Sequence, residues 1–408
     1  MMILKIAWRN LWRSKLRSFV VIISMTVGLV GGLFSAAWLN GMTQQRVMNA
    51  FDIETSHIQI HHPKFADNMD LKMSIENTDE ILAKIDDIEG VEASTSRIFT
   101  NAMAATASKN LGVNVYGIDL ERENEVFKLY DDIKEDGGSF FETKKRYPIV
   151  VSSSLAEKLK VKLKSKIVLT FQDYNGEITG SAFKVVGIFK TQNSTWDKLH
   201  VFVKESDMRS LMSLPDNYSH EIDIKLNDFN KSEEIKNEIA SIFPDYKVEE
   251  WREIQPFLRV INDFMGFIMT IFIAIILAAL GFGIVNTMLM VILERTRELG
   301  MLMAIGMTKR RIFSMIMVET VLLTLVGAFF GELISILLIN YFGTVGIDLS
   351  SVSEGMVSAG YSPMTYPALK SSMYIQITIM VIITGIISSI YPAIKALKLH
   401  PTEAIRTI

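Results

Sequence analysis

The chain has 408 residues, of which 49% are hydrophobic and 21% are charged, and its mean hydropathy is +0.26. This composition excludes a disordered chain, which carries fewer apolar side chains, and it disfavours a wholly soluble enzyme. The formal net charge is only −3, and the chain has no cysteine. Disulfides, thiolate catalysis and cysteine-ligated metals are therefore excluded.

Four long apolar runs divide the chain, at residues 19–39, 264–293, 312–342 and 373–397. Each is longer than the ~20 residues that an α-helix needs to cross the hydrocarbon core of a bilayer, so we predict four transmembrane helices. The first run also exceeds the ~7–15 apolar residues of a signal peptide, which favours an uncleaved anchor over cleavage near Ser35.

The predicted architecture is a membrane protein of four transmembrane α-helices, with a large extracytoplasmic α+β domain inserted between helices 1 and 2. The segments in chain order are an amphipathic helix (1–18), the first transmembrane helix (19–41), the α+β domain (42–259), the second transmembrane helix with a stalk (260–293), a helical loop segment (294–311), the third transmembrane helix (312–342), a loop (343–372), the fourth transmembrane helix (373–397) and a tail (398–408).

Loop charges predict the orientation of these segments. Basic residues outnumber acidic ones by 13 to 3 in the N-terminal segment, the 294–311 segment and the C-terminal end taken together, whereas residues 42–259 hold 28 basic and 37 acidic residues. Because cytoplasmic loops carry an excess of Lys and Arg, we expect both termini and the 294–311 segment in the cytoplasm. The small net charge is the cancellation of a basic inner side against an acidic outer side.

The N-terminal segment has the pattern of an amphipathic helix that lies at the membrane surface and contacts membrane lipid. One face carries basic residues every four positions, and the adjoining face carries tryptophan and leucine. The basic residues are Lys5, Arg9, Arg13 and Arg17, and the tryptophans are Trp8 and Trp12. It is either a topological anchor or a partner contact, and nucleic-acid binding is disfavoured for so short a basic segment.

The 42–259 domain contains two similar runs of strand, helix and strand. The first comprises residues 57–62, 77–90 and those from 91 onward, and the second comprises 221–226, 231–243 and 246–249. Their periodicity predicts two related β-α-β units. Between them we expect strands at 149–151, 166–171 and 183–189, with a hairpin turn at Asn175 and Gly176.

The sequence shows no catalytic or metal-binding pattern. His57 and His61 share one face of a predicted strand and His62 lies on the other, which indicates strand surface rather than a metal site. There is no Ser/His/Asp constellation, no paired-carboxylate motif and no G-x-x-x-x-G-K-[ST] phosphate loop. If the protein uses ATP, another chain must bind it.

Several polar and small residues in and beside the apolar runs are candidates for function. The 294–311 segment is too apolar for a solvated loop, so we predict a short helix docked against a cytoplasmic partner.

The second run is long enough to protrude as a stalk or to tilt, since 30 helical residues rise ~45 Å. The polar candidates inside the runs are Asn286, Glu319 and Glu332, and the small-residue pairs that fit close helix packing are Gly28 with Gly32 and Gly327 with Gly331.

Glu319 and Glu332 are open to two interpretations. An intramembrane carboxylate is a functional candidate, and two of them suggest a proton relay. Alternatively, each reaches toward its nearer membrane surface, and this is favoured because the other apolar runs offer no relay partner.

Three stretches resemble the permease subunits of the MacB/FtsX/lipoprotein-releasing class of ABC transporters. They are residues 286–288 and 294–300 with 304–306, residues 391–393 with Ala396 and 401–406, and residues 7–11 with 15–17. The order of one span, a large outer domain and three further spans is also similar to that class.

The resemblance implies an ATP-driven complex in the bacterial inner membrane, with two permease subunits, the same chain or a homologue, and a cytoplasmic ABC ATPase dimer. No cofactor would bind this chain, and ATP and Mg would bind the partner ATPase. ATPase closure would act on the outer domain through a coupling helix, a mechanical stroke rather than passage through a pore. The coupling residues would be Glu294, Arg295, Arg297, Glu298, Leu299, Gly300, Ala304 and Gly306.

Within that class, residues 52–65 look most like the lipoprotein-releasing permeases, which extract lipoproteins for transfer to a periplasmic chaperone. One permease of such a pair grips the chaperone with a proline-bearing arm, but the hairpin expected here at 171–183 is short and has no proline. The protein is therefore the arm-less member of a pair or serves another cargo. The alternatives are an FtsX-like regulator of a periplasmic cell-wall hydrolase and MacB-like efflux of an amphiphilic substrate.

Overall fold

The computed structural model describes residue 9 and residues 15–65, 69–129, 133–141 and 146–397. Most of the predicted amphipathic helix, including Lys5, Trp8, Trp12 and Arg13, lies outside the described residues, and so does the 398–408 tail with its 401–406 motif.

The chain divides into two compact units. The helical unit contains the residues up to Thr43, Asp263–Asp348 and the residues from Met364, and the outer unit contains Gln44–Asn262 and Leu349–Pro363.

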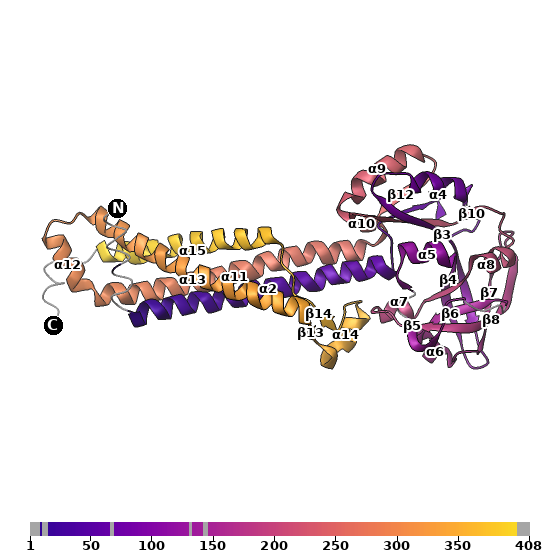
Figure 1. The fold of residues 1–408 in the computed structure, drawn as a ribbon, viewed down its shortest axis with the longest axis horizontal. Helices are drawn as coiled ribbons and strands as arrows, with labels where there is room; N and C mark the ends of the chain where they lie inside the picture. The colour runs from indigo at the N-terminus through magenta and orange to yellow at the C-terminus, as the bar shows by residue number, and fades with distance from the viewer. Residues whose placement is uncertain (1–8, 10–14, 66–68, 130–132, 142–145, 398–408) are drawn as a thin grey trace. The chain divides into compact units, whose positions relative to one another are not determined.

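Four helices of the described chain are long and apolar enough to cross a membrane, which confirms the predicted number of spans (Figure 1). They are α2 (Lys15–Ile53), α11 (Pro256–Glu294), α13 (Lys309–Val345) and α15 (Ser371–Leu397).

All four helices extend past the expected boundaries, and two of them do so into the outer unit. α2 continues to Ile53 and α11 begins at Pro256, so residues 42–53, which we expected in the α+β domain, are helical. The division between the units falls inside both helices, after Thr43 in α2 and before Asp263 in α11. Polar residues end an apolar run without ending a helix, which is why hydropathy made the predicted helices too short.

α2 packs closely against α11 through glycine. A Cβ atom added to Gly28 would lie 2.5 Å from Cδ2 of Leu280, and one added to Gly32 would lie 3.1 Å from Cγ2 of Ile276. The missing side chains let the two backbones approach, which favours helix association in lipid.

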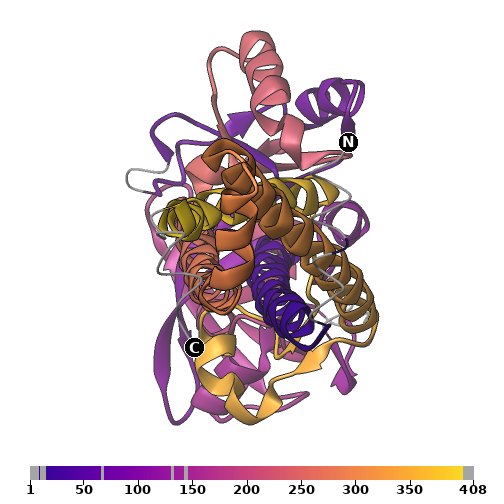
Figure 2. The same cartoon turned by 90° about the vertical axis from the view of Figure 1, so that its left-hand side faces the viewer.

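Another face of α2 packs against α13 in the same way. A Cβ atom on Gly327 would lie 2.8 Å from Cβ of Met25, and one on Gly331 would lie 2.8 Å from Cδ2 of Leu29. The hydroxyl of Thr26 donates a hydrogen bond of 3.2 Å to the carbonyl of Gly327. α2 therefore contacts both α11 and α13, and Figure 2 shows these helices end-on.

α15 completes the bundle through two further glycines. A Cβ atom on Gly281 of α11 would lie 2.7 Å from the hydroxyl of Ser388, and one on Gly385 of α15 would lie 2.5 Å from the hydroxyl of Thr324 on α13. The contacts of α2 and of α15 with both α11 and α13 thus each include a glycine.

The outer unit is built on a sheet of ten strands in the part of the chain that the structure describes. The strand order is β12-β1-β11-β3-β4-β9-β6-β8-β5, and β7 pairs with β3 and β8. One half contains the two predicted β-α-β units, which are confirmed. They are β1 (Ile58–His61), α4 (Thr78–Asp86) and β3 (Val91–Ala105), and then β11 (Glu221–Leu226), α9 (Ser232–Ile242) and β12 (Lys247–Glu250).

These two units interlock. Their strands alternate in the order β12-β1-β11-β3 with every neighbour antiparallel, which is the split β-α-β arrangement. Ile58 and Ile60 of β1 and Ile222 and Ile224 of β11 are fully buried in a core that they share with residues of α4 and α9.

The other half of the sheet has its own core and contains the strands predicted at 149–151, 166–171 and 183–189. Its strands are β4 (Asn110–Ile118), β5 (Ile133–Gly138), β6 (Pro148–Ser152), β7 (Lys166–Gln172), β8 (Ile178–Phe189) and β9 (His200–Lys204). Its helices are α5 (Leu120–Val126), α6 (Ser153–Leu159), α7 (Ser194–Asp197) and α8 (Glu205–Leu211). Short elements complete the unit: β2 (Ile75–Glu76) paired with β10 (Tyr218–Ser219), η2 (Phe229–Lys231) and α10 (Trp251–Ile254).

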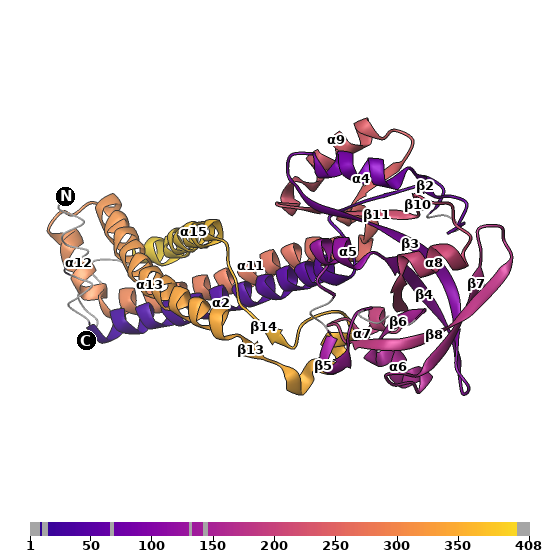
Figure 3. The ribbon, with the colours of Figure 1, turned by 45° about the vertical axis from the view of Figure 1, so that its right-hand side comes forward.

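The predicted hairpin joins β7 to β8 (Figure 3). The carboxylate of Asp173 accepts hydrogen bonds from the backbone N–H of Asn175 at 2.9 Å and of Glu177 at 2.8 Å. Gly176 has a φ of +89°, a conformation that favours glycine. The turn between β7 and β8 therefore consists of five residues, and the hairpin does not extend into an arm of the kind that grips a chaperone.

The ends of α2 and α11 that belong to the outer unit are packed into an aromatic cluster. The ring of Phe51 lies 4.5 Å from that of His57 and 5.5 Å from that of Trp251. Val47 of α2 and Leu258 of α11 belong to the same buried cluster. The two helices are thus fixed to the split β-α-β half by apolar contact.

Three buried histidines act as neutral polar links in the outer unit. Nδ1 of His57 accepts from the N–H of Leu226 at 2.9 Å, and Nδ1 of His220 accepts from the N–H of Phe99 at 3.2 Å. Burial lowers the pKa of each of these imidazoles to about 4. Burial also lowers the pKa of His200 to about 4, and its Nδ1 lies 2.6 Å from the carbonyl of Trp196.

One buried cation holds several carboxylates together. The guanidinium of Arg97 bonds Glu123 at 2.5 Å and lies 3.4 Å from Asp223, while its Cζ lies 3.8 Å from the centre of the Phe127 ring. Burial alone would lower the pKa of Arg97, but these carboxylates and Glu221 raise it above its ordinary value. The arginine therefore stays charged and links β3, β11 and α5.

The loop expected at 343–372 is partly a component of the outer unit, which the sequence did not indicate. β13 (Ile347–Asp348) pairs with β14 (Met364–Thr365), and the residues between them include η3 (Ser350–Val352) and α14 (Ser353–Ser358). The guanidinium of Arg46 binds both oxygens of Glu54, at 3.0 and 3.1 Å, and donates to the carbonyl of Ala359 at 3.0 Å. A cation on α2 thus holds this segment in place.

Replacing Gly28 or Gly327 by leucine is expected to destabilise the helical unit by about 1–3 kcal/mol each, because the new side chain must displace a packed neighbour. Gly31 is the matched control on α2, since a Cβ atom there meets nothing within 4 Å. Thermal unfolding of the full chain in detergent measures the difference. Equal melting temperatures for Gly28→Leu and Gly31→Leu would contradict the packing described here.

Lowering the pH from 6.5 to 4 is expected to destabilise the outer unit. In this interval the histidines take up protons in the unfolded chain but not in the folded one, so each contributes a loss of at most about 3 kcal/mol. Asp197 acts in the opposite direction, because burial raises its pKa to about 6 and its protonation favours the folded chain.

Denaturant titrations of the full chain across this pH range, followed by tryptophan fluorescence, measure the loss. The variant His220→Gln retains a hydrogen-bonding amide but does not titrate, so its stability should fall less than that of the unmodified chain. An identical pH dependence for the two would refute the role assigned to His220.

Candidate functional site

The 294–311 segment forms a helical corner in the helical unit. α11 ends at Glu294, and α12 (Thr296–Ala304) begins directly after Arg295. Gly306 has a φ of +99°, which larger residues rarely adopt, and it ends the turn that leads to α13. The short helix predicted for this segment is present.

One face of α12 is buried against the bundle. Leu299 and Gly300 are buried, and Leu299 shares an apolar cluster with Ile292 of α11 and with Ile312 and Met315 of α13. These two predicted coupling residues therefore fix α12 against the bundle.

The opposite face of α12 is exposed. Arg297, Met301, Ala304 and Ile305 are exposed at helical spacing, and the side chain of Ile305 is 84% exposed. Gly306 is also exposed, beside this face. Large apolar side chains next to a cation on a surface helix are typical of a protein contact.

Arg295 and Glu298 belong to a partly buried polar contact at the corner. The guanidinium of Arg295 donates from Nε to Glu298 at 3.1 Å and from Nη1 to both oxygens of Glu319, at 2.9 and 3.1 Å. The side chain of Glu319 is 7% exposed and that of Arg295 is 18% exposed. The structure thus gives the intramembrane carboxylate of Glu319 a partner that sequence reasoning did not name.

The other intramembrane polar candidates are not brought together with this pair. Glu332 is half-buried on α13 and makes no ion pair with a described residue, and 13 residues of helix place it about 20 Å from Glu319. Asn286 is exposed on α11, and its amide has no hydrogen bond to the described part of the chain. The geometry therefore does not assemble a relay of carboxylates.

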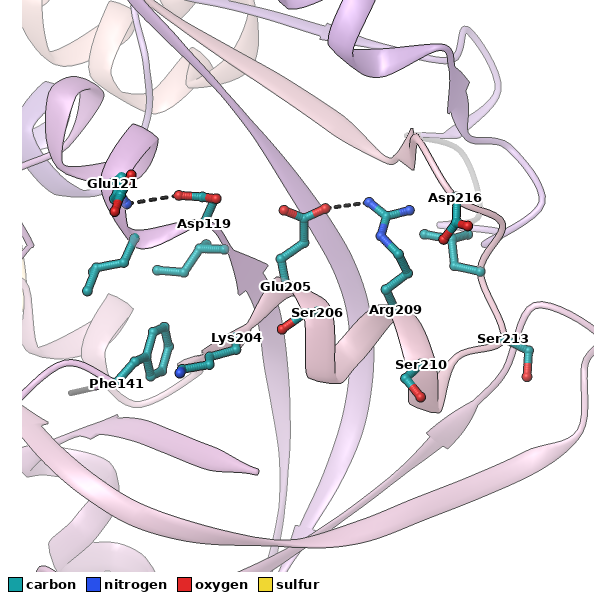
Figure 4. Close-up of a pocket in the computed structure, with 13 residues that line it drawn as sticks. Asp119, Glu121, Phe141, Lys204, Glu205, Ser206, Arg209, Ser210, Ser213 and Asp216 are labelled. Atoms are coloured by element: carbon teal, nitrogen blue, oxygen red, sulfur yellow. Dashed lines mark hydrogen bonds and ion pairs between the residues drawn. The ribbon is translucent and has the colours of Figure 1, made fainter. Parts of the chain in front are cut away.

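The outer unit has a cavity of about 920 Å³ beside α5 and α8 (Figure 4). Its lining combines an apolar part, which includes Ile118 and Phe141, with charged groups and three serines. The polar lining residues are Asp119, Glu121, Lys204, Glu205, Ser206, Arg209, Ser210, Ser213 and Asp216. Glu205 and Arg209 form an ion pair across one turn of α8.

This cavity brings apolar, charged and hydroxyl side chains together. None of the described residues that line it is a histidine, so the three serines have no imidazole base to activate them. The described residues also contain no group of three His, Asp or Glu side chains placed to hold a metal ion. His61, for example, contacts Glu249 at 2.6 Å as a pair between neighbouring strands.

Two family descriptions match the chain. Residues 18–242 match the MacB-like periplasmic core domain, and residues 270–401 match the FtsX-like permease C-terminal family.

Curated relatives are similar over most or about half of the chain. The macrolide export ATP-binding/permease protein MacB of Campylobacter jejuni is 26% identical over 98% of this chain and 60% of its own length. The uncharacterized ABC transporter permease YknZ of Bacillus subtilis is 27% identical over 56% of this chain and 55% of its own length. The chain thus spans about 60% of the MacB protein that it matches.

Solved structures are similar to parts of the chain. The extracellular domain of YknZ from Gram-positive bacteria covers 48% of this chain at 17% identity, with all of that chain covered and a TM-score of 0.34. The periplasmic region of MacB from Actinobacillus actinomycetemcomitans covers 53% at 14% identity, with 98% of that chain covered and a TM-score of 0.35.

The match to the periplasmic core domain covers more than half of the chain, and the match to the permease C-terminal family covers α12, α13, α15 and most of α11. The α+β outer unit inserted between the first two long apolar helices agrees with this pair of matches. The chain belongs to the MacB/FtsX class of ABC transporter permeases.

Proposed function

We propose that the chain is the permease subunit of an ATP-driven transporter that converts motion of a cytoplasmic ATPase into motion of the outer unit. The observation that carries this proposal is the exposed face of α12. A solvated helix gains nothing from exposing Met301 and Ile305, whereas an interface uses such side chains as its apolar centre. Arg297 on the same face supplies a cation for an acidic partner surface.

The continuity of α11 supports a mechanical role. Its 39 residues form one helix of about 58 Å, from Pro256 in the outer unit to Glu294 beside α12. A rigid helix carries a displacement of one end to the other. Phe51, Trp251 and Leu258 fix the outer-unit ends of α2 and α11 by packing, so displacement there would act on the split β-α-β half.

The proposed complex contains further chains. ATP and Mg would bind a dimer of ABC ATPases rather than these 408 residues, which contain no phosphate loop. A second permease is supported by Asn286, because an exposed amide on a membrane helix is stabilised when another helix supplies a hydrogen-bond partner. An excess of basic residues near both termini supports a cytoplasmic position for them at the bacterial inner membrane.

The proposed cargo is amphiphilic. A groove of about 760 Å³ between α2 and α11 is lined almost entirely by apolar and small residues, including Val27, Gly31, Phe272 and Ile275. Such a groove suits the apolar part of an amphiphile. The relative named for macrolide export supports efflux of such a molecule.

Lipoprotein extraction is the second candidate, with the same apolar groove holding a lipid anchor. Its sequence support lies in residues 52–65, where the structure gives His57 and His61 contacts within the sheet. These residues are thus explained by the fold and do not favour lipoprotein over other amphiphiles. An FtsX-like regulator would use the polar cavity for a hydrolase and would leave the apolar groove without a cargo.

Replacing Ile305 by aspartate is expected to weaken ATPase binding by about 2–4 kcal/mol, at least 30-fold, because a charge enters the apolar centre of the interface. Co-purification of the ATPase with the tagged full chain, titrated by surface plasmon resonance, measures this. Ile178→Asp is the control, since Ile178 is 78% exposed in the outer hairpin. Equal ATPase affinity for both variants would defeat the assignment of this face.

The cargo is tested by purifying the full chain in mild detergent with its ATPase and identifying bound molecules by mass spectrometry. If the chain exports an amphiphile, a small amphiphilic molecule should co-purify with the unmodified chain. It should be lost in the variant Gly31→Phe, because the new side chain fills the groove. Recovery of lipoproteins would favour extraction, and recovery of a cell-wall hydrolase without a small amphiphile would favour the regulator.

A further inference from the structure

We propose that the ion pair between Arg295 and Glu319 is the joint through which α12 moves α13, so that α13 transmits force to the outer unit beside α11. This inference rests on the proposed function, because it assigns a route to the motion that the ATPase supplies. Arg295 and Glu319 are positioning residues in this route, and neither would touch ATP or cargo.

The geometry makes one guanidinium the shared partner of two helices. Arg295 lies at the corner between α11 and α12, and it donates to Glu298 on α12 and to both oxygens of Glu319 on α13. Its planar fork allows these bonds to coexist, which a lysine ammonium on a flexible stem does not reproduce. The corner and α13 are therefore tied at one point by directional contacts.

Burial makes this tie difficult to break. The Glu319 side chain is 7% exposed, and its neighbours on α13, Ile316 and Leu323, belong to the apolar cluster of the bundle. Separating the pair would leave a carboxylate without a counter-ion in apolar surroundings, which is strongly unfavourable. When a partner displaces α12, the favourable response is that α13 follows.

The contacts of α13 beyond Glu319 extend the route through the bundle. Gly327 and Gly331 lie against Met25 and Leu29 of α2, and Thr324 lies against Gly385 of α15. Because these contacts are close and leave no free space between the side chains, we expect α13 to shift as a whole helix. A contact confined to a loop would not transmit such a shift.

The chain that follows α13 reaches the outer unit. After β13, residues Leu349–Pro363 belong to that unit, where the carbonyl of Ala359 accepts from Arg46 and the carbonyl of Ser358 accepts from Thr195 at 2.9 Å. A displacement of α13 would thus act on the outer unit through residues 349–363, which follow α13 in the chain. The outer unit would then be displaced by two helices, α11 and α13.

The test uses the full chain reconstituted with the ATPase that co-purifies with it. Because the chain has no cysteine, cysteines introduced at Leu337 of α13 and Ile178 of the outer unit are its only labelling sites. Both positions are exposed, at 62% and 78%. Pulsed electron paramagnetic resonance measures the distance between spin labels with and without a non-hydrolysable ATP analogue.

We expect an ATP-dependent change of this distance in the parent chain and its loss in Glu319→Gln and Arg295→Met. The exchanged variant Arg295→Glu with Glu319→Arg should restore it. The KM for ATP should stay unchanged in the single variants, while cargo-stimulated turnover falls about tenfold, as expected for a lost coupling between sites. Glu332→Gln is the matched control on the same helix and should retain the distance change.

Two results would overturn the inference. One is an ATP-dependent distance change that persists in Glu319→Gln. The other is a loss that the charge exchange does not restore, which would show that the pair is needed only for folding. Failure of any ATPase to bind the parent chain is a different outcome, because it appears without a substitution and defeats the proposed function itself.

Discussion

Close contact between backbones is the constraint on which the helical unit depends. Inside a bilayer, apolar side chains gain nothing by leaving water, so helices associate through packing and a few hydrogen bonds. α2 meets this constraint on two sides, with Gly28 against α11 and with its residue Met25 against Gly327 of α13. Because α2 is packed on both sides, a movement of α2 requires that α11 and α13 move as well.

Buried charge is the second organising feature, and it recurs in one form. Arg46, Arg97 and Arg295 each bring together elements that are distant in sequence, and each bonds a carboxylate. Apolar packing tolerates some sliding, whereas a guanidinium bonded to a carboxylate fixes both distance and direction. In this fold the arginines lie where a helix meets another element, which is where sliding would disturb the geometry most.

The sequence predicted the elements well because hydropathy and periodicity act locally. The four long helices, the two β-α-β units and the turn at Gly176 all follow from patterns within about 30 residues. Interactions between distant residues were not predictable in this way. Glu319 was visible as an intramembrane carboxylate, but its partner Arg295 lies at the corner between α11 and α12, and no local pattern identifies it.

The shifted boundaries and the unpredicted structure within residues 343–372 have the same origin. Asn40 and the polar residues after it ended the apolar run of α2, although the helix continues to Ile53 in the outer unit. The 343–372 segment lacked a strong periodicity, so its contact with Arg46 could not be read from its own residues. For the coupling residues, the sequence located α12 but did not separate Leu299, which faces inward, from Ile305, which faces outward.

The anchoring of Leu349–Pro363 by Arg46 has a consequence for any attempt to study the outer unit alone. A soluble fragment of residues 44–262 would be continuous in sequence but incomplete in structure, since Ala359 would no longer accept from the guanidinium. The surface that this segment covers, including the hydroxyl of Thr195, would be exposed to solvent. A faithful fragment of the outer unit therefore consists of two pieces of chain, with residues 349–363 supplied through a linker or as a separate peptide.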